Sequence, residues 1–357
     1  MNTIVNHFDP LLQRIQTFSP LSLNGLERYS GRALGLTDEN DTILLPSTIK
    51  NGWDWICDHY TAVGLKHTMD VVWDNRFEVM RDFPNHGLSV FIFSRELHSV
   101  FPDAQWLSIT DRMNSKNEFI DLCTQLRVPT PATWTFRDSV NVHTNTFKYP
   151  VYLKTAVSVS GLGVVRCDSE LKLFEYCSRI DGALQIQEEV NALTFLNLTY
   201  LVENNGAARH IAVTEQILNG CSHNGNIYPA RSEPWSVTDP IANYMVSEGM
   251  RGVFGFDVAL TKDGFYVIEC NPRYNGSVYP AVIAQKIGAT CWLAKNFHTH
   301  HTSFEDLKLD RIAYDPVEKS GVVVVNWGCV QDGKVGLLIC GNEEEQGAFE
   351  SALVSVL

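Results

Sequence analysis

The sequence of 357 residues lacks several features that would assign its class directly. It contains no run of about 18 apolar residues, so no segment is expected to span a lipid bilayer. The stretch from Met1 to Pro10 has no basic region followed by an apolar one, so we expect no secretory signal. Positive charge is scarce, because 28 Lys and Arg oppose 41 Asp and Glu and the formal net charge is −13. Nucleic acids and anionic membranes bind clustered Lys and Arg, so neither is an expected partner.

Cysteine is present, but not in the arrangement of a disulfide scaffold or a thiolate metal site. The nine cysteines are scattered, their number is odd, and no Cys-x-x-Cys pair occurs. This density is far below that of a disulfide-stabilised domain. Most of them are therefore expected to be small buried side chains of a protein from a reducing compartment. The expected location is the cytoplasm.

The hydrophobic pattern divides the chain into parts of different character. The length allows two or three folding units, and the composition, with 45% hydrophobic and 19% charged residues, is that of a globular protein. The first part alternates strand-like and helix-like segments and indicates an α/β domain, whereas hairpin patterns predominate later and indicate an α+β core. The expected parts are an α/β domain at 1–110, a second unit at 111–190, a third at 191–305 and a small hairpin-plus-helix module at 306–357.

The strongest local pattern is a hairpin of two apolar strands joined at Lys262-Asp263-Gly264. A three-residue loop with glycine in the left-handed position predicts that Asp257 lies directly opposite Glu269. Asn271 then shares the face of Glu269, because strand residues two apart point to the same side. A two-residue loop would instead put Asp257 and Glu269 on opposite faces of the hairpin.

The hairpin pattern predicts two facing carboxylates beside one amide oxygen. Facing carboxylates repel each other unless a cation or a shared proton neutralises them. Oxygen donors without His or Cys suit Mg²⁺ or Mn²⁺, with water and phosphate oxygens completing the coordination. Arg273, two positions beyond Asn271, would lie beside the metal and face an anionic reactant. On spacing alone, an ordinary solvent-exposed hairpin explains the pattern equally well.

A second pattern is a loop of small residues, 158–163, that follows the strand-like segment ending at Lys154. Backbone N–H groups in such a loop are open to phosphate oxygens, and Lys154 would add a point charge beside them. The loop is neither a Walker A motif nor a dinucleotide-binding fingerprint, because the glycine spacing and the following helix are missing. Taken by itself, the loop fits an ordinary hairpin turn better than a phosphate site.

Together, the two patterns resemble the ATP-grasp superfamily of carboxylate–amine ligases, over roughly residues 110–280. Members have two ATP-binding lysines, a glycine-rich flap, a hinge strand at the adenine, and a late hairpin with metal ligands. The ATP-binding positions that match are Lys116 and Lys154 for the lysines, Ser158, Ser160, Gly161 and Gly163 for the flap, and Gln187, Glu188, Glu189 and Val190 for the hinge. The metal ligands would be Asp257, Glu269 and Asn271, and Arg273 matches an arginine that orients an acyl-phosphate in some members.

The resemblance implies an ATP-grasp fold, in which 1–110 precedes an ATP-binding lid at 111–190, a catalytic subdomain at 191–305 and a small C-terminal module. It implies ATP and Mg²⁺ (or Mn²⁺) as cofactors. The implied enzyme is ADP-forming: it activates the carboxylate of an amino acid or peptide as an acyl-phosphate and joins it to an amine, with Lys154 and Arg273 as catalytic residues. Its partners would be these small molecules, and ligases of this architecture are often dimers.

One departure and two alternatives accompany the resemblance. Many members carry a glutamate for the ribose hydroxyls after the hinge, where this chain has Asn191-Ala192-Leu193-Thr194, so Asn191 or Thr194 would substitute. The stretches 214–218 and 224–229 also resemble peptide ligases of the pheganomycin type. One alternative is an ATP-binding sensor or regulatory module without ligase turnover. The other is a ligase with a thiol, hydroxyl or carrier-bound acceptor.

Overall fold

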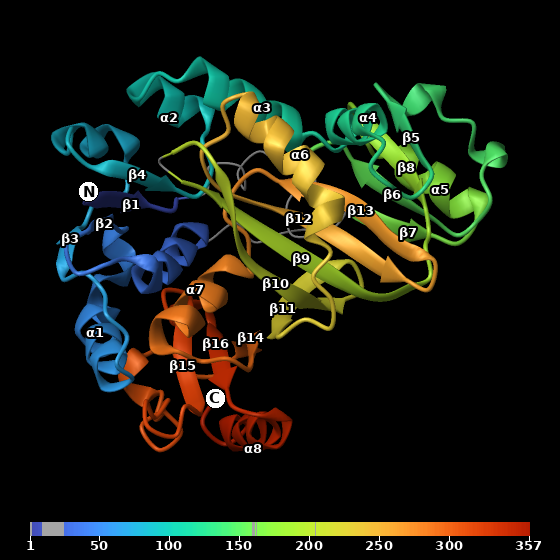
Figure 1. Cartoon of the computed structure of the whole chain (residues 1–357). Coiled ribbons are helices and arrows are strands. Elements are labelled where there is room, and N and C mark those ends of the chain that lie inside the picture. Colours follow the sequence, from blue (N-terminus) through green and yellow to red (C-terminus); the bar gives the residue numbers. More distant parts are fainter. Residues whose placement is uncertain (1, 9–24, 159–160, 162, 204) are drawn as a thin grey trace.

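The computed structural model describes residues 2–8, 25–158, 161, 163–203 and 205–357 and arranges them around three β-sheets. Figure 1 shows the N-terminal sheet on the left, a small sheet on the right, and a long central sheet between them. The expected mixture of an α/β domain and an α+β core is confirmed. None of the helices in the described ranges has the length and apolar character needed to cross a membrane.

The N-terminal sheet is parallel and has the strand order β3-β2-β1-β4. Its strands are β1 (Thr3–Asn6), β2 (Thr42–Leu44), β3 (Asp70–Val72) and β4 (Gly87–Val90). The helical segments of this part are η2 (Leu26–Leu36), η3 (Ser47–Gly52), α1 (Trp53–Ala62), η4 (Phe77–Asp82), α2 (Arg95–Val100) and α3 (Ala104–Asn114). Because the carboxyl ends of parallel strands meet at one edge, His7 after β1 and Phe91 after β4 reach the same side of the domain.

The small sheet lies in the part expected to be the lid, a name kept below for this sheet, and has the antiparallel order β5-β8-β6-β7. Its strands are β5 (Thr133–Phe136), β6 (Val151–Thr155), β7 (Val164–Cys167) and β8 (Leu184–Glu188), with the helical segments α4 (Lys116–Leu126), η5 (Ser139–Asn141), η6 (Thr144–Thr146) and α5 (Glu170–Cys177). Leu153 and Ile186 belong to the apolar core of the lid. Since strand residues alternate, their neighbours Lys154 and Gln187 face the opposite side.

The central sheet has eight strands in the order β13-β12-β9-β10-β11-β14-β16-β15. The strands are β9 (Ala192–Val202), β10 (Ala208–Asn219), β11 (Ser222–Tyr228), β12 (Gly252–Thr261), β13 (Gly264–Asn271), β14 (Trp292–His298), β15 (Gly321–Asn326) and β16 (Lys334–Cys340). The accompanying helical segments are α6 (Trp235–Ser247), α7 (Val278–Ile287), η7 (Phe304–Asp306), η8 (Val330–Asp332) and α8 (Glu343–Leu353). This sheet carries the expected metal hairpin, β12–β13, on one edge.

The C-terminal hairpin extends the central sheet, so the expected small module at 306–357 is not structurally separate. β16 pairs with β14 along its whole length, from Trp292 opposite Cys340 to His298 opposite Lys334. β14 was not predicted from the sequence, and it is the strand through which the hairpin joins the sheet. The expected helix at the C-terminus is present as α8.

The β12–β13 hairpin brings Asp257 opposite Glu269 as predicted, but by a different route. Thr261 pairs with Gly264, so the loop has two residues rather than the three that we expected. Between Asp257–Glu269 and the next pair the register shifts, because Ile268 has no partner on β12. This β-bulge inserts one residue and returns Glu269 to the face of Asp257. The shorter loop and the bulge therefore compensate each other.

Gly225 in β11 sets how closely that strand approaches β14. A Cβ atom at this position would lie 2.1 Å from the carbonyl oxygen of Ala294. We expect Gly225→Ala to lower the melting temperature by several degrees, because forcing apart a packed contact costs about 1–3 kcal/mol. Gly347→Ala is the control, since a Cβ at Gly347 in α8 meets nothing within 4 Å. Equal melting temperatures for the two variants, measured by circular dichroism, would contradict the packing argument.

Candidate active site

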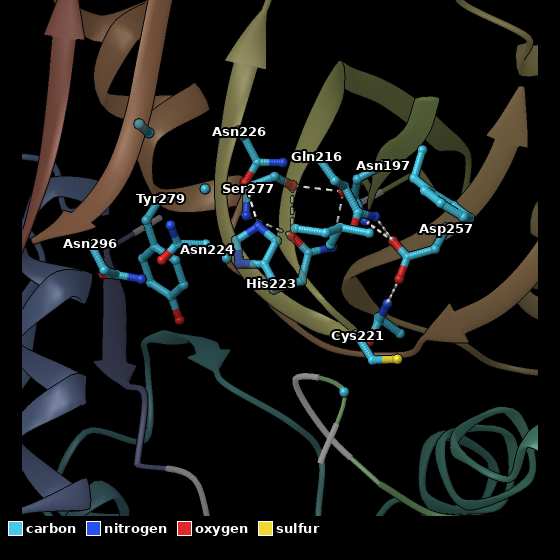
Figure 2. Close-up of a pocket in the computed structure, with 18 of the residues that line it drawn as sticks. Asn197, Gln216, Cys221, His223, Asn224, Asn226, Asp257, Ser277, Tyr279 and Asn296 are labelled. Carbon is cyan, nitrogen blue, oxygen red and sulfur yellow. Dashed lines mark hydrogen bonds between the residues drawn. The ribbon is translucent and has the colours of Figure 1, made fainter. Parts of the chain in front are cut away.

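A cavity of about 520 Å³ lies between η2, the lid sheet and the central sheet. This volume is in the range of small-molecule binding sites in proteins. Figure 2 shows Asp257, Asn197 and Gln216 toward one end of the cavity and Tyr279 and Asn296 toward the other. Residues of the small and central sheets line it together with His7 and Phe91, which follow strands β1 and β4 of the N-terminal sheet, so the fold, rather than any one motif, creates the cavity.

The two facing carboxylates have unlike surroundings. Asp257 Oδ1 accepts hydrogen bonds from the side-chain amides of Asn197 at 2.6 Å and Gln216 at 2.7 Å. Its Oδ2 accepts a longer bond, 3.3 Å, from the amide of Asn271. The second carboxylate, Glu269, lies 3.1 Å from the ammonium group of Lys116. One acid is therefore held by neutral donors and the other by a cation.

The pKa values of the two acids shift in opposite directions as a result. Burial and the charge of Glu269 raise the pKa of Asp257. Burial also opposes ionisation of Glu269, but the positive charges of Lys116, Lys154 and Arg273 outweigh it and lower the pKa of that carboxyl. The pair as it stands therefore disfavours two negative charges side by side. In the described ranges, no cluster of three or more His, Cys, Asp and Glu is placed to hold a metal, so a cation here would also need other oxygen donors.

The two expected lysines are both buried at the site. Lys116 begins α4, where its ammonium group also donates to the Ser158 hydroxyl at 3.0 Å and its backbone N–H donates to the carbonyl of Ala156 at 2.7 Å. Lys154 donates to the side-chain oxygen of Gln187 at 2.7 Å. Burial lowers the pKa of Lys154 to about 8, although the negative charge of Glu269 opposes the shift. The lid thus delivers two ammonium groups to the hairpin of the central sheet.

Arg273 is also buried, with its side chain 6% exposed. One guanidinium nitrogen lies 3.3 Å from Asn114 Oδ1 at the end of α3. The next residue, Tyr274, donates its backbone N–H to the carbonyl of Phe91 at 3.0 Å. Arg273 is therefore positioned by contacts with both the N-terminal domain and the hairpin. Cys270 lies on the other face, as alternation predicts, with its thiol 3.8 Å from the sulfur of Met245.

The expected flap lies against the central sheet. Gly161 has φ +76°, and a Cβ there would lie 2.0 Å from the carbonyl oxygen of Cys221 in the β10–β11 turn. Gly163 accepts a hydrogen bond from the Thr155 backbone at 2.9 Å. Ser160, the remaining expected flap residue, lies outside the described residues. Close packing on Cys221 means that only glycine fits at position 161.

The expected hinge strand reaches the cavity in part. Gln187, Glu188 and Val190 line the cavity, whereas Glu189 places its carboxylate 2.6 Å from the guanidinium of Arg166 in a partly exposed ion pair. Only the backbone of Glu189 thus remains for a ligand. Of the two proposed ribose contacts, Thr194 donates its hydroxyl to Glu215 at 3.3 Å and Asn191 is exposed, and neither lines the cavity.

Several cavity residues were not predicted from the sequence. Asn197 lies opposite Asp257 because β9 pairs with β12, and only the strand order reveals that proximity. Gln216 lies one strand further away, on β10. The side chains of Arg32 and His223 also line the cavity, although no motif marks either of them. The one sequence signal that could have indicated the strand residues among them is the occurrence of polar residues at alternate positions of the strands.

The comparisons with known proteins agree with this geometry. The sequence model of a family described as an ATP-grasp domain matches residues 113–277, a range that contains both lysines and the whole β12–β13 hairpin. No curated protein sequence matches the chain.

Solved structures show the same fold at low sequence identity. The N5-carboxyaminoimidazole synthetase from Staphylococcus aureus, complexed with ADP, has a TM-score of 0.60 and 12% identity, with 88% of this chain and 90% of that chain covered. The synthase from Aspergillus clavatus, in complex with ADP and 5-aminoimidazole ribonucleotide, has a TM-score of 0.60 and 11% identity, with 99% and 98% covered. The ribonucleotide synthetase from Thermus thermophilus has a TM-score of 0.57 and 12% identity, with 92% and 96% covered.

The contact between flap and sheet generates a test of the lid. Gly161→Ala would push the flap away from Cys221, and we expect the Kd for ADP with Mg²⁺ to rise by about tenfold, the equivalent of about 1.4 kcal/mol. Gly182→Ala is the matched control, because Gly182 in the lid also has positive φ, +104°, but a Cβ there meets nothing within 4 Å. Calorimetric titration measures both. An equal rise in the two variants would attribute the effect to backbone strain and reject the flap contact.

Proposed function

The chain contains an ATP-grasp domain over residues 113–277, and on this premise we propose that it is an ADP-forming ligase that joins a carboxylate to an amine. ATP and Mg²⁺ are general to enzymes of this family. The observation that carries the proposal concerns burial of positive charge. Among the described residues, the Lys and Arg side chains that are buried are Lys116, Lys154 and Arg273, and all three lie at the hairpin site. Burying three cations together is costly unless an anion compensates them, and Glu269 supplies only one negative charge.

ATP would lie between the lid sheet and the β12–β13 hairpin. Lys116 and Lys154 would neutralise phosphate charge from the lid side, and the hinge residues Gln187 to Val190 would face the adenine. The hairpin donors fit Mg²⁺, since they are hard oxygens on one buried face, and the ion would neutralise charge on the transferring phosphate. The chain's contribution to phosphate transfer is then positioning and charge neutralisation, without a protein nucleophile.

The reaction would proceed in two displacements. A carboxylate oxygen of the first substrate attacks the γ-phosphorus, the bond to the β-phosphate oxygen breaks, and ADP leaves. The nitrogen of the amine then attacks the carbonyl carbon of the acyl-phosphate and expels inorganic phosphate. Arg273, positioned by Asn114, would hold the carboxylate and later the acyl-phosphate oxygen. Closure of the flap would exclude water, which would otherwise hydrolyse the acyl-phosphate.

We propose that His223 is the general base that accepts the proton of the attacking amine. Its Nε2 lies 2.7 Å from Asn226 Oδ1, and the Asn226 amide nitrogen donates to the Thr214 hydroxyl at 2.9 Å. Asn226 therefore presents its oxygen to the ring, so Nε2 carries the proton and Nδ1 keeps its lone pair. Burial lowers the pKa of His223, so the ring is a neutral base near pH 7. It packs on Gly276, three residues beyond Arg273, where a Cβ would approach Nδ1 to 3.1 Å.

The formation of an amide or peptide bond is the finer part of the proposal. It is supported by the resemblance to peptide ligases of the pheganomycin type, whereas the solved structures named above are synthetases of a different stated substrate. A nucleotide sensor without turnover is the rival function. The burial of Arg273 beside the proposed phosphate site favours a ligase, because a sensor needs no second anion-binding group there. A thiol, hydroxyl or carrier-bound acceptor would use the same first step.

Glu269→Gln tests the metal role, because it removes one charge and leaves the side-chain volume nearly unchanged. We expect ADP formation to fall by a factor of about 100 or more, since charge on the phosphates is no longer neutralised. The assay is coupled ADP release with a mixture of amino acids as carboxylate and amine donors. Asp263→Asn is the control, because Asp263 is an exposed acid in the turn of the same hairpin. Turnover of Glu269→Gln at half the control rate would reject the metal site.

His223→Gln tests the second displacement separately from the first. Glutamine can still donate to Asn226 but cannot accept the amine's proton. We expect ADP to form while the amount of condensed product per ADP falls about tenfold or more, since the acyl-phosphate then hydrolyses. Mass spectrometry of the product beside the ADP assay measures this ratio. His210→Gln, at an exposed ring outside the cavity, is the control. An unchanged ratio of product to ADP would exclude His223 as the base.

A further inference from the structure

Arg32 lines the cavity and has no carboxylate partner among the described residues. Arg32 lies in η2, and its guanidinium carbon is 4.1 Å from the centre of the Tyr279 ring and 5.5 Å from that of Phe91. Within the described part of the chain, no carboxylate oxygen lies within 4 Å of it, and its Nε is buried without a hydrogen-bond partner. The nearby Asp332 is engaged elsewhere, since it pairs with Arg28 at 2.7 Å.

Stacking on aromatic rings accounts for the position of Arg32 but not for its unpaired Nε–H group. A guanidinium held against Tyr279 by cation–π attraction is stabilised whether or not a ligand is present. A buried N–H without an acceptor is unfavourable, however, and most such groups in proteins have a partner. Arg32 is therefore better explained as a group whose acceptor is a ligand of the cavity.

A second buried group in the same part of the cavity also lacks a partner. Asn326, at the end of β15, is 5% exposed, lines the cavity, and has a side-chain oxygen without a hydrogen-bond donor among the described residues. The Asn326 oxygen would accept a hydrogen bond from an N–H or O–H group of a ligand. The unpaired donor of Arg32 would in the same way bind an oxygen atom of the ligand. Three further amide side chains, Asn224, Asn226 and Asn296, line the same cavity.

We propose that the substrate bound at this end carries a second anionic group, a carboxylate or a phosphate, which Arg32 binds. The inference rests on the proposed ligase function and narrows its substrate. The molecule is small and polar, with an N–H or O–H group for Asn326 and an anion at the end away from the reacting atoms. Arg32 and Arg273 would then each bind one negatively charged group, in different parts of the cavity.

Direct anion binding tests the site without knowledge of the substrate. The probes are acetate and methyl phosphate, titrated calorimetrically into protein saturated with ADP and Mg²⁺, so that the proposed phosphate site is already filled. We expect saturable binding of at least one probe, with a Kd about tenfold or more higher in Arg32→Gln, since a charge-assisted bond is lost. The tighter probe distinguishes carboxylate from phosphate as the ligand group. Arg32→Lys keeps the charge and should retain part of the affinity.

The controls separate this inference from the proposed function. Arg95→Gln removes an exposed arginine of the same domain that is paired with Asp111, and should bind the probes like the wild type. Equal Kd values for the wild type and Arg32→Gln would overturn the anion site. In the ADP assay, amino acids with a second carboxylate are compared with their side-chain amides (glutamate with glutamine), and ethanolamine phosphate with ethanolamine. Preference for the anionic member that Arg32→Gln abolishes supports the inference. Absence of ADP with every pair would count against the ligase, while the titrations still decide the role of Arg32.

Discussion

The active site depends on one electrostatic constraint: two carboxylates, Asp257 and Glu269, face each other on adjacent strands inside the protein. Burial disfavours a charged carboxylate, and a second charge beside it adds repulsion. The structure meets this constraint unequally, because Lys116 holds Glu269 whereas amide groups of Asn197 and Gln216 hold Asp257. A divalent cation would allow both acids to ionise at once. The pair is thus suited to a reactant that arrives with its own metal, as ATP does.

The same constraint couples parts of the chain that fold around different cores. The cations that stabilise Glu269 come from the start of α4, from β6 and from the segment after β13. Two of them are fixed by contacts outside the hairpin: the Lys116 backbone bonds Ala156, just after β6, and the Arg273 side chain bonds Asn114 at the end of α3. Movement of the lid would therefore change the electrostatics of the hairpin directly.

The sequence alone predicted the local motifs well, but it predicted poorly which distant residues come into contact. The pairing of Asp257 with Glu269 followed from hairpin periodicity, although the loop length was wrong and a bulge at Ile268 restored the register. Bulges leave little trace in composition, so this compensation could not have been derived. The neighbours of the hairpin depend on strand order, which brings Asn197 beside Asp257 from 60 residues away in the chain. No sequence motif marks Arg32 as a cavity residue, because only tertiary packing places η2 against the central sheet.

The distribution of positive charge then explains how a protein of net charge −13 serves anionic reactants. An acidic surface disfavours anions in general, so binding must come from cations removed from competing carboxylates. Burial achieves this for Lys154 and Arg273, and aromatic packing on Tyr279 achieves it for Arg32. Each of these groups lacks a carboxylate within 4 Å among the described residues, in a chain where acids outnumber bases. Placed in the cavity without a direct carboxylate partner among the described residues, these cations are available to an anionic ligand.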